Sequence, residues 1–140
     1  MIREGNIQIP FRYAAGKAGS RFLCALRDSG KIMASRCGTC GIVYCPARSF
    51  CPRCGEALEE SVEVGPYGTL TSWTEIPGRG FFGLVKLDDA DMSILHRIIA
   101  PPATPQLGTR VVCRMALERT GSILDIEGFE LLFDEKENEI

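Results

Sequence analysis

The sequence has little histidine, little tryptophan and no strong charge of one sign. Its 140 residues include one histidine and one tryptophan, and the formal net charge is −2. A GxSxG nucleophile elbow, a Walker-type phosphate loop and an HExxH zinc motif are all missing. The single histidine, His96, is better explained as a satisfied or exposed side chain than as a catalytic base. We therefore expect a chain that does not catalyse a reaction by itself.

Long apolar runs are also missing. The longest, such as residues 81–85, are far too short to cross a bilayer. The N-terminal residues have no apolar core typical of a signal peptide. With 45% hydrophobic and 24% charged residues, the composition is that of a globular protein. These features predict a cytoplasmic location and no membrane partner.

The charge is distributed unevenly along the chain. Residues 1–60 hold nine Lys or Arg against five Asp or Glu, a balance of +4, whereas residues 61–140 hold seven against thirteen, a balance of −6. Single-stranded nucleic acids bind in basic grooves that display aromatic side chains. The acidic C-terminal part therefore argues against nucleic acid as a partner, although a nucleic-acid-binding module remains the alternative function.

Cysteine is abundant, with seven residues. Four of them form two CxxCG units, Cys37-x2-Cys40 and Cys51-x2-Cys54, separated by ten residues. Two tight pairs in a chain without an export signal favour metal binding over disulfides. Each pair brings two sulfurs to one ion, and the spacer is long enough for a hairpin. We therefore predict one structural zinc ion with four cysteine ligands.

The surroundings of the four cysteines support this interpretation. Gly41 and Gly55 each follow the second cysteine of a pair, where a left-handed backbone is often needed. A ribbon this short buries little core, so metal binding must supply its folding free energy, about 10–16 kcal/mol in small zinc peptides. Iron in a rubredoxin-like centre is the rival interpretation. Three arginines should offset the thiolate charge or contact a phosphate or a partner: Arg36, Arg48 and Arg53.

The other three cysteines show no metal-ligand spacing. Cys45 lies in the spacer without a nearby mate, and Cys24 and Cys113 lie in apolar patterns. We interpret Cys24 and Cys113 as small core residues, and nothing in the sequence assigns a role to Cys45.

The pattern of apolar residues predicts a mostly β chain in three parts. Residues 1–30 form an extended arm and a short helix, with Ser20 as N-cap and Gly30 near its end. Residues 31–62 form the zinc ribbon, entered by a strand at residues 31–36. Residues 63–140 form a five-stranded OB-fold barrel with a short acidic tail, and a plain meander is the alternative. The five expected strands span residues 68–76, 81–87, 92–100, 109–117 and 122–133.

Aromatic residues on adjacent expected strands form a second candidate site. Trp73, Phe81 and Phe82 either belong to the barrel core or present a face that stacks on a ligand such as the adenine of coenzyme A. Arg79, in the PGRG turn between them, would then meet a phosphate.

These motifs together resemble a known family. The run from Gly19 to Gly55, with its four zinc cysteines, and the GPYGTLTSWTEI…GLVKLDDAD continuation resemble the DUF35 family, which combines a rubredoxin-like zinc ribbon with an OB-fold. The similarity extends from about residue 9 to residue 132. The family usually has proline where Cys45 stands.

The resemblance implies a noncatalytic accessory subunit of a thiolase-type acyl-CoA C-acyltransferase or related aldolase. The partner supplies the catalytic residues, and the OB-fold lies near the acyl-CoA site. Relatives serve acetoacetyl-CoA metabolism, steroid side-chain removal and aromatic degradation, with 2-benzoylsuccinyl-CoA as one candidate substrate. A stand-alone binder of acyl-CoA is a further alternative.

Overall fold

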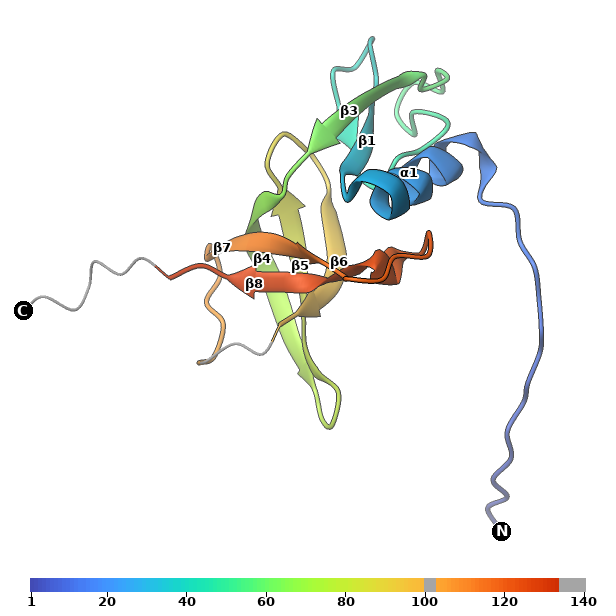
Figure 1. Cartoon of the computed structure of the whole chain (residues 1–140), viewed down its shortest axis with the longest axis vertical. Coiled ribbons are helices and arrows are strands. Elements are labelled where there is room, and N and C mark those ends of the chain that lie inside the picture. The colour runs from blue at the N-terminus through green and yellow to red at the C-terminus, as the bar shows by residue number, and fades with distance from the viewer. Residues whose placement is uncertain (100–102, 134–140) are drawn as a thin grey trace, which may run out of the picture.

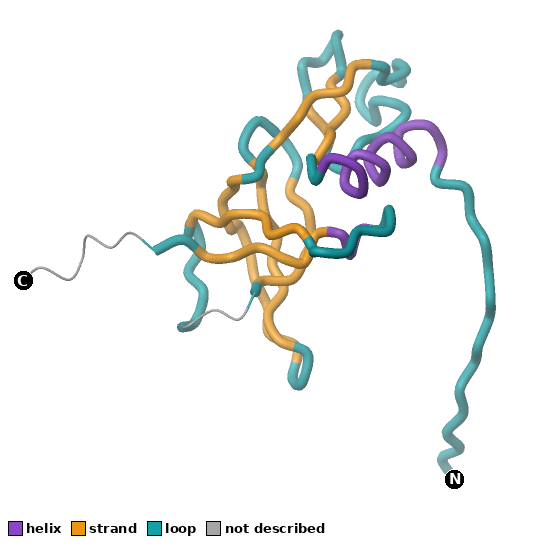
Figure 2. Tube along the Cα trace, in the orientation of Figure 1, coloured by secondary structure: helices purple, strands orange, loops and turns teal. Residues whose placement is uncertain are grey.

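A computed structural model describes residues 1–99 and 103–133. A helix and a small sheet lie at one end of the molecule and a β-barrel at the other, while the N-terminal arm (residues 1–15) projects away from both (Figures 1 and 2). The elements in chain order are α1 (Gly16–Ser29), β1 (Ile32–Arg36), β2 (Val43–Tyr44), β3 (Glu60–Val64), β4 (Tyr67–Ile76), β5 (Gly80–Leu87), β6 (Ser93–Ile98), β7 (Arg110–Met115), the 3₁₀ helix η1 (Ile123–Asp125) and β8 (Ile126–Leu131).

Helix α1 presents one apolar face to the core. Ala18, Phe22 and Leu26 recur every fourth residue and are all buried, as the helical period requires. The helix ends where predicted, because Gly30 adopts a left-handed backbone and its N–H donates to the carbonyls of the last turn. The predicted start was wrong. Ser20 lies inside the helix, which begins at Gly16, where burial of Ala18 extends the packed face by one turn.

The zinc ribbon contains a three-stranded antiparallel sheet in the order β2-β1-β3. The expected strand before the first cysteine pair is β1. Strand β3 was not predicted. It pairs with β1 along its whole length, and cross-strand ion pairs of Arg36 with Glu60 and Lys31 with Glu63 lie on this ladder.

The barrel has the predicted OB-fold rather than a meander. Its closed strand order is β4-β5-β6-β8-β7, with β7 pairing back to β4. A meander would pair only consecutive strands, whereas here β6 pairs with β8 in parallel. When the five barrel strands are numbered 1 to 5 along the chain, their order around the barrel is 1-2-3-5-4, with strand 4 pairing back to strand 1. This order is the OB topology.

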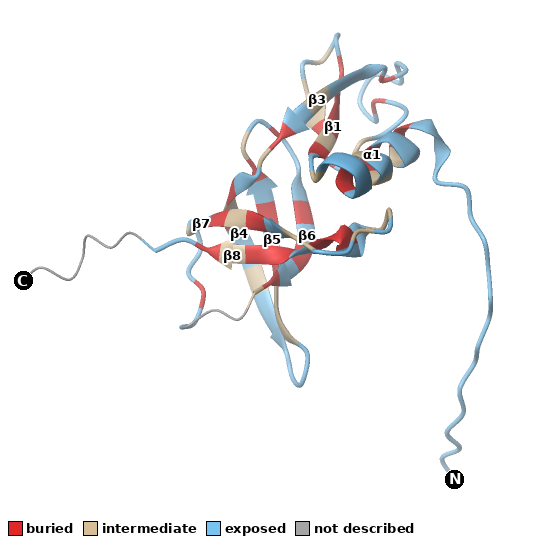
Figure 3. Cartoon of the chain, in the orientation of Figure 1, coloured by how far each residue is buried: buried red, intermediate tan, exposed pale blue. Residues whose placement is uncertain are grey.

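The barrel core forms because inward and outward side chains alternate along each strand (Figure 3). Inward residues are buried, and two glycines in the barrel strands let neighbouring strands approach closely. A Cβ on Gly83 would lie 2.5 Å from the Cδ1 atom of Leu70, and one on Gly128 would lie 2.8 Å from the Cγ1 atom of Ile99. The buried inward residues are Leu70, Val85, Leu87, Ile94, Ile98, Val111, Ile126, Phe129 and Leu131.

The last predicted strand begins later than expected. Ser122 caps η1, and its side chain accepts the N–H of Leu124 while the Asp125 side chain accepts the N–H of Ser122. Leu124 lies inside the expected strand, but it belongs to η1 and is 73% exposed. The reason is local: this capping box satisfies the backbone in a helical turn before β8 starts. The expected acidic tail, residues 134–140, lies outside the described residues.

The acidic turn after β5 joins the barrel to the ribbon. Asp91 accepts the N–H of Val43 at 2.8 Å through its carboxylate and donates its own N–H to the carbonyl of Val43 at 3.0 Å. Asp88 in the same turn binds Arg110 of β7 with two hydrogen bonds, one of 2.8 Å. One continuous cluster of buried residues also runs from α1 through β1 into the barrel. No helix among the described residues is long and apolar enough to cross a membrane.

Candidate metal centre and partner surfaces

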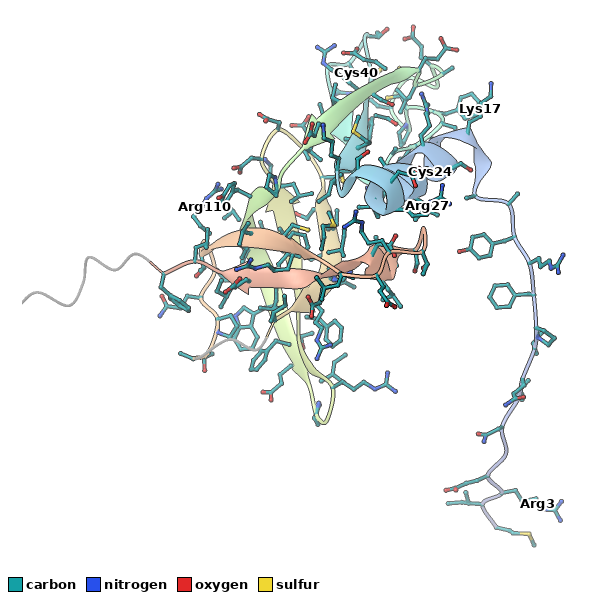
Figure 4. All side chains as sticks on the ribbon, in the orientation of Figure 1. Arg3, Lys17, Cys24, Arg27, Cys40 and Arg110 are labelled. Carbon is teal, nitrogen blue, oxygen red and sulfur yellow. The ribbon has the colours of Figure 1, made fainter. Side chains whose placement is uncertain are left out.

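The four predicted zinc cysteines come together in the ribbon. The Sγ atoms of Cys37, Cys40, Cys51 and Cys54 all lie within 4.8 Å of one another. Figure 4 shows Cys40 at the ribbon end of the molecule, away from the barrel. The sulfurs come from two separate turns of the chain, as the paired spacing indicated.

Each turn has the same local geometry. Gly41 donates its N–H to the carbonyl of Cys37, and Gly55 donates to that of Cys51, both at 2.8 Å. Both glycines have positive φ, 72° and 78°, so the predicted left-handed backbone is confirmed. Because this backbone disfavours side chains, glycine is the residue that lets each turn close under its two sulfurs.

The cysteine cluster has polar support from residues around it. Cys37 and Cys51 are buried, and the backbone N–H of Cys40 points at the Cys37 sulfur at 3.4 Å. The buried hydroxyl of Tyr44 lies 3.2 Å from the Cys51 sulfur. Sequence reasoning missed Tyr44, since an aromatic residue in an apolar strand carries no signal of a sulfur contact.

The donor set fits one structural zinc ion. Four thiolate sulfurs fill the tetrahedral shell that zinc prefers, so the protein leaves no coordination position for a substrate. A hydrogen bond from Tyr44 lowers the pKa of Cys51 to about 6, whereas interaction with Cys54 raises the pKa of Cys40 to about 12. Neighbouring thiols therefore resist ionising together, and a bound cation offsets this repulsion.

The three arginines near the cluster have different surroundings. Arg36 pairs with Glu60 at 3.4 Å. The guanidinium of Arg48 lies over the ring of Tyr44, 5.6 Å from its centroid, and the backbone N–H of Arg48 donates to the hydroxyl of Ser35. The charge of Arg36 is thus shared with a carboxylate, and compensation of the thiolates stays a prediction for Arg48 and Arg53.

The three remaining cysteines differ in burial. Cys113 is buried as predicted, and so is Cys45, and burial raises the pKa of both thiols to about 12. Cys24 was predicted to be a core residue but is exposed, because it lies on the side of α1 opposite Phe22 and Leu26. The guanidinium of Arg27 lies 3.7 Å from its sulfur.

The predicted aromatic cluster is split between the two faces of the paired strands β4 and β5. Trp73 and Phe81 are neighbours, with ring centroids 5.7 Å apart, and both pack against the barrel core. Phe82 is the next residue along the strand and lies on the outer face with Arg79. The structure therefore brings Arg79 to Phe82 but separates both from the other two aromatic side chains.

The outer face carries an apolar groove of about 890 Å³. Its apolar lining includes Phe82, Leu95, Leu117 and Leu124. Its charged groups are Arg79, Arg97 and Glu127. Leu95, Leu117 and Leu124 are exposed. Exposed apolar side chains gathered in this way are typical of interaction sites, so the groove is a candidate partner surface.

His96 borders this groove but is satisfied by the fold. Its Nδ1 atom accepts the N–H of Arg97 at 2.8 Å, and its Nε2 atom, 3.2 Å from the carbonyl oxygen of Ile123, donates to that oxygen. Burial lowers the pKa of the imidazole, which favours this neutral form. His96 thus has the satisfied role that the sequence favoured.

The ribbon matches a known family in its sequence. Residues 25–59 match the model described as ChsH2, rubredoxin-like zinc ribbon domain. No curated protein is significantly similar to the chain in sequence.

Two solved structures share the overall fold. A protein of unknown function from the DUF35 family of Sulfolobus solfataricus is 22% identical, with 85% of each chain covered and a TM-score of 0.63. A chain of the Ltp2-ChsH2(DUF35) aldolase is 18% identical, with 86% of this chain and 98% of that one covered and a TM-score of 0.62. The ribbon of this chain thus matches the ChsH2 zinc ribbon in sequence, and the whole chain shares the ribbon-and-barrel fold of these two DUF35 structures.

Proposed function

We propose that the chain is a zinc-stabilised, noncatalytic accessory subunit of a thiolase-type acyl-CoA C-acyltransferase or a related aldolase. The observation that carries this proposal is the match of residues 25–59 to the ChsH2 zinc ribbon. The similar fold of a chain in the Ltp2-ChsH2(DUF35) aldolase supports it, because that enzyme combines a DUF35 protein with a second protein.

The zinc ribbon would then have a bracing role. Four protein sulfurs complete the shell of the metal, so the zinc holds the two cysteine turns of the ribbon together and takes no part in the reaction. The catalytic subunit would supply the nucleophile and the general base. A reducing compartment such as the cytoplasm would keep the four thiols available for the metal.

The outer groove of the barrel is the surface that we assign to the acyl-CoA side of the complex. Arg79 and Arg97 place two positive charges beside an apolar floor that includes Phe82, a combination suited to a thioester with an apolar acyl chain and phosphate groups. Trp73 and Phe81 pack against the core, so their contribution to this surface would be to support β5. An aryl substrate such as 2-benzoylsuccinyl-CoA could stack on the ring of Phe82 in this groove.

Reconstitution tests this function. The full-length zinc-loaded chain would be mixed with the thiolase-superfamily subunit that co-purifies with it from the source cells. We expect a stoichiometric complex on gel filtration, acyl-CoA turnover by the complex, and none by this chain alone. Turnover by the isolated chain would contradict the accessory role. Salt-sensitive binding to an oligonucleotide without a thiolase-type partner would support the nucleic-acid alternative instead.

A further inference from the structure

The N-terminal arm has the side-chain pattern of a half-buried β-strand without a sheet. Between residues 7 and 13, apolar and non-apolar positions alternate, with Ile7, Ile9, Phe11 and Tyr13 at the odd positions. These four residues are 71–85% exposed. The rings of Phe11 and Tyr13 lie on the same side of the arm, with centroids 6.2 Å apart. In an extended strand these odd-numbered positions share one face. Figure 4 shows the arm projecting away from the folded part of the chain, and the described residues leave these four apolar side chains uncovered.

Pro10 makes the two backbone edges of this arm unequal. In an extended strand the N–H and C=O groups of one residue point to the same edge, and those of the next residue point to the opposite edge. Pro10 has no N–H, so the edge formed by Gln8, Pro10 and Arg12 lacks a donor at its centre. The edge formed by Ile7, Ile9, Phe11 and Tyr13 is complete. The arm can therefore pair well on one side only.

The folded part of the chain offers this strand no partner. Within residues 1–99 and 103–133, no hydrogen bond joins the arm to the rest of the molecule. The barrel is closed, and the free edges of the ribbon sheet are the two-residue strand β2 and the strand β3. The exposed residues of β3 are polar, namely Glu60, Ser61 and Glu63. A second copy of the chain would thus offer an edge without apolar pockets beside it.

We propose that the arm adds as an edge strand to a sheet of the catalytic subunit. Pairing occurs through the odd-numbered edge, and the odd-numbered side chains insert into apolar pockets beside that sheet, spaced about 6.6 Å apart. The paired segment, residues 7–13, spans about 20 Å at this rise. Pro10 faces away from the sheet, where it prevents a further strand from adding to the outer edge. This inference rests on the proposed function, since it assigns the binding mode of the same partner.

Proline and alanine substitutions at adjacent positions test the pairing edge. Phe11→Pro and Phe11→Ala both remove the ring, but only proline removes an N–H from the complete edge. Arg12→Pro and Arg12→Ala form the matched control on the edge that Pro10 already interrupts. Proline also favours an extended backbone at the residue before it, so none of the four variants opposes the shape of the strand.

The dissociation constant of each full-length variant for the catalytic subunit would be measured by titration calorimetry. We expect Phe11→Pro to bind about tenfold more weakly than Phe11→Ala, because a partner carbonyl loses its donor. Arg12→Pro should bind like Arg12→Ala. Zinc content and the melting temperature should not change, because the arm lies outside the folded core.

Three kinds of outcome overturn different statements. Strand addition through this edge is wrong if the wild-type chain binds the catalytic subunit but Phe11→Pro and Phe11→Ala bind it equally well. It is also wrong if Arg12→Pro weakens binding as much as Phe11→Pro does. If the wild-type chain does not bind the catalytic subunit at all, the proposed function is wrong and the assignment of the arm is lost with it. If the wild-type chain self-associates and Phe11→Pro abolishes this self-association, the partner of the arm is a second copy of the chain and not the catalytic subunit.

Discussion

The hydroxyl group of Tyr44 lies 3.2 Å from the sulfur of Cys51, in a buried position between the second strand of the ribbon and its second cysteine turn. The contact joins two parts of the hairpin that the metal also joins. The ring of Tyr44 packs in the small apolar cluster of the ribbon together with Leu58 and two of the ligand cysteines. One side chain thus contributes both to the ribbon core and to the orientation of a ligand.

Removing this hydroxyl should weaken zinc binding. We expect Tyr44→Phe to lower zinc affinity about tenfold to a hundredfold, because residues that orient metal ligands by hydrogen bonds have effects of this size. The ring and its packing stay in place, so the variant should still fold with saturating zinc. Competition against a chromogenic chelator measures the affinity. Tyr67→Phe, at a half-exposed tyrosine in the barrel, is the control, and an equal affinity in both variants would contradict the role of Tyr44.

Removal of zinc should unfold the ribbon. Its own core has only four buried residues, of which two are ligand cysteines, so the metal supplies much of the folding free energy. We expect chelation, or Cys40→Ser, to abolish hydrogen-exchange protection at residues 37–58 while the barrel strands keep theirs. Mass spectrometry of exchanged peptides distinguishes the two parts. Unchanged protection after complete zinc loss would show that packing alone holds the ribbon.

The features that sequence reasoning predicted correctly are those with a local cause. The cysteine cluster follows from two CxxCG turns, each closed by its own glycine, so spacing alone located it. Strand β7 follows from the alternation of Val111 and Cys113 with outward residues. The end of α1 follows from Gly30, whose left-handed backbone terminates a helix wherever it occurs.

The features that sequence reasoning missed depend on contacts between residues far apart in the chain. Strand β3 has only Val62 and Val64 as apolar residues, and its pairing with β1 supplies the rest of its stability. The outward position of Phe82 follows from the barrel register, in which Phe82 pairs with Thr74 and Arg97 on neighbouring strands. The groove combines residues from β5, β6 and the segment around η1, and a local pattern carries no information about such a combination.

The close approach at Gly83 predicts a destabilising substitution. A Cβ atom there would lie 2.5 Å from Leu70 and 3.1 Å from a terminal methyl group of Ile98. We expect Gly83→Ala to lower the free energy of unfolding by about 1–3 kcal/mol, because the packed barrel must shift to accept a methyl group. Urea denaturation measures the change. Gly38→Ala, at a position with open space, is the control and should change stability by less than about 0.5 kcal/mol.

Asp125 should make stability depend on pH. Burial would raise its pKa, but the N–H groups of Thr120, Gly121 and Ser122 together hold it below the ordinary value. Since the folded-state pKa is lower than the unfolded one, the carboxylate stabilises the fold above about pH 4 and loses this effect as the pH falls through the folded-state value.

We therefore expect Asp125→Asn to be less stable than the parent protein at neutral pH, with a difference that narrows as the pH falls below about 4. Denaturant titrations of both proteins at several pH values and equal zinc concentration measure this difference. Glu118→Gln, at an exposed carboxylate, is the control. A difference between parent and Asp125→Asn that does not vary with pH would assign the effect to packing rather than to charge.

The two faces of the paired strands β4 and β5 should respond differently to aromatic substitutions. Trp73 packs against the barrel core, so Trp73→Ala should lower the free energy of unfolding by about 2 kcal/mol. Phe82 lines the outer groove with Arg79, so Phe82→Ala and Arg79→Ala should leave stability nearly unchanged but weaken the apparent affinity of the reconstituted complex for its acyl-CoA substrate. Thermal unfolding and KM measurements separate the two effects. If Phe82→Ala changes neither quantity while Trp73→Ala changes KM alone, the acyl-CoA surface lies on the opposite face of β5 from the groove.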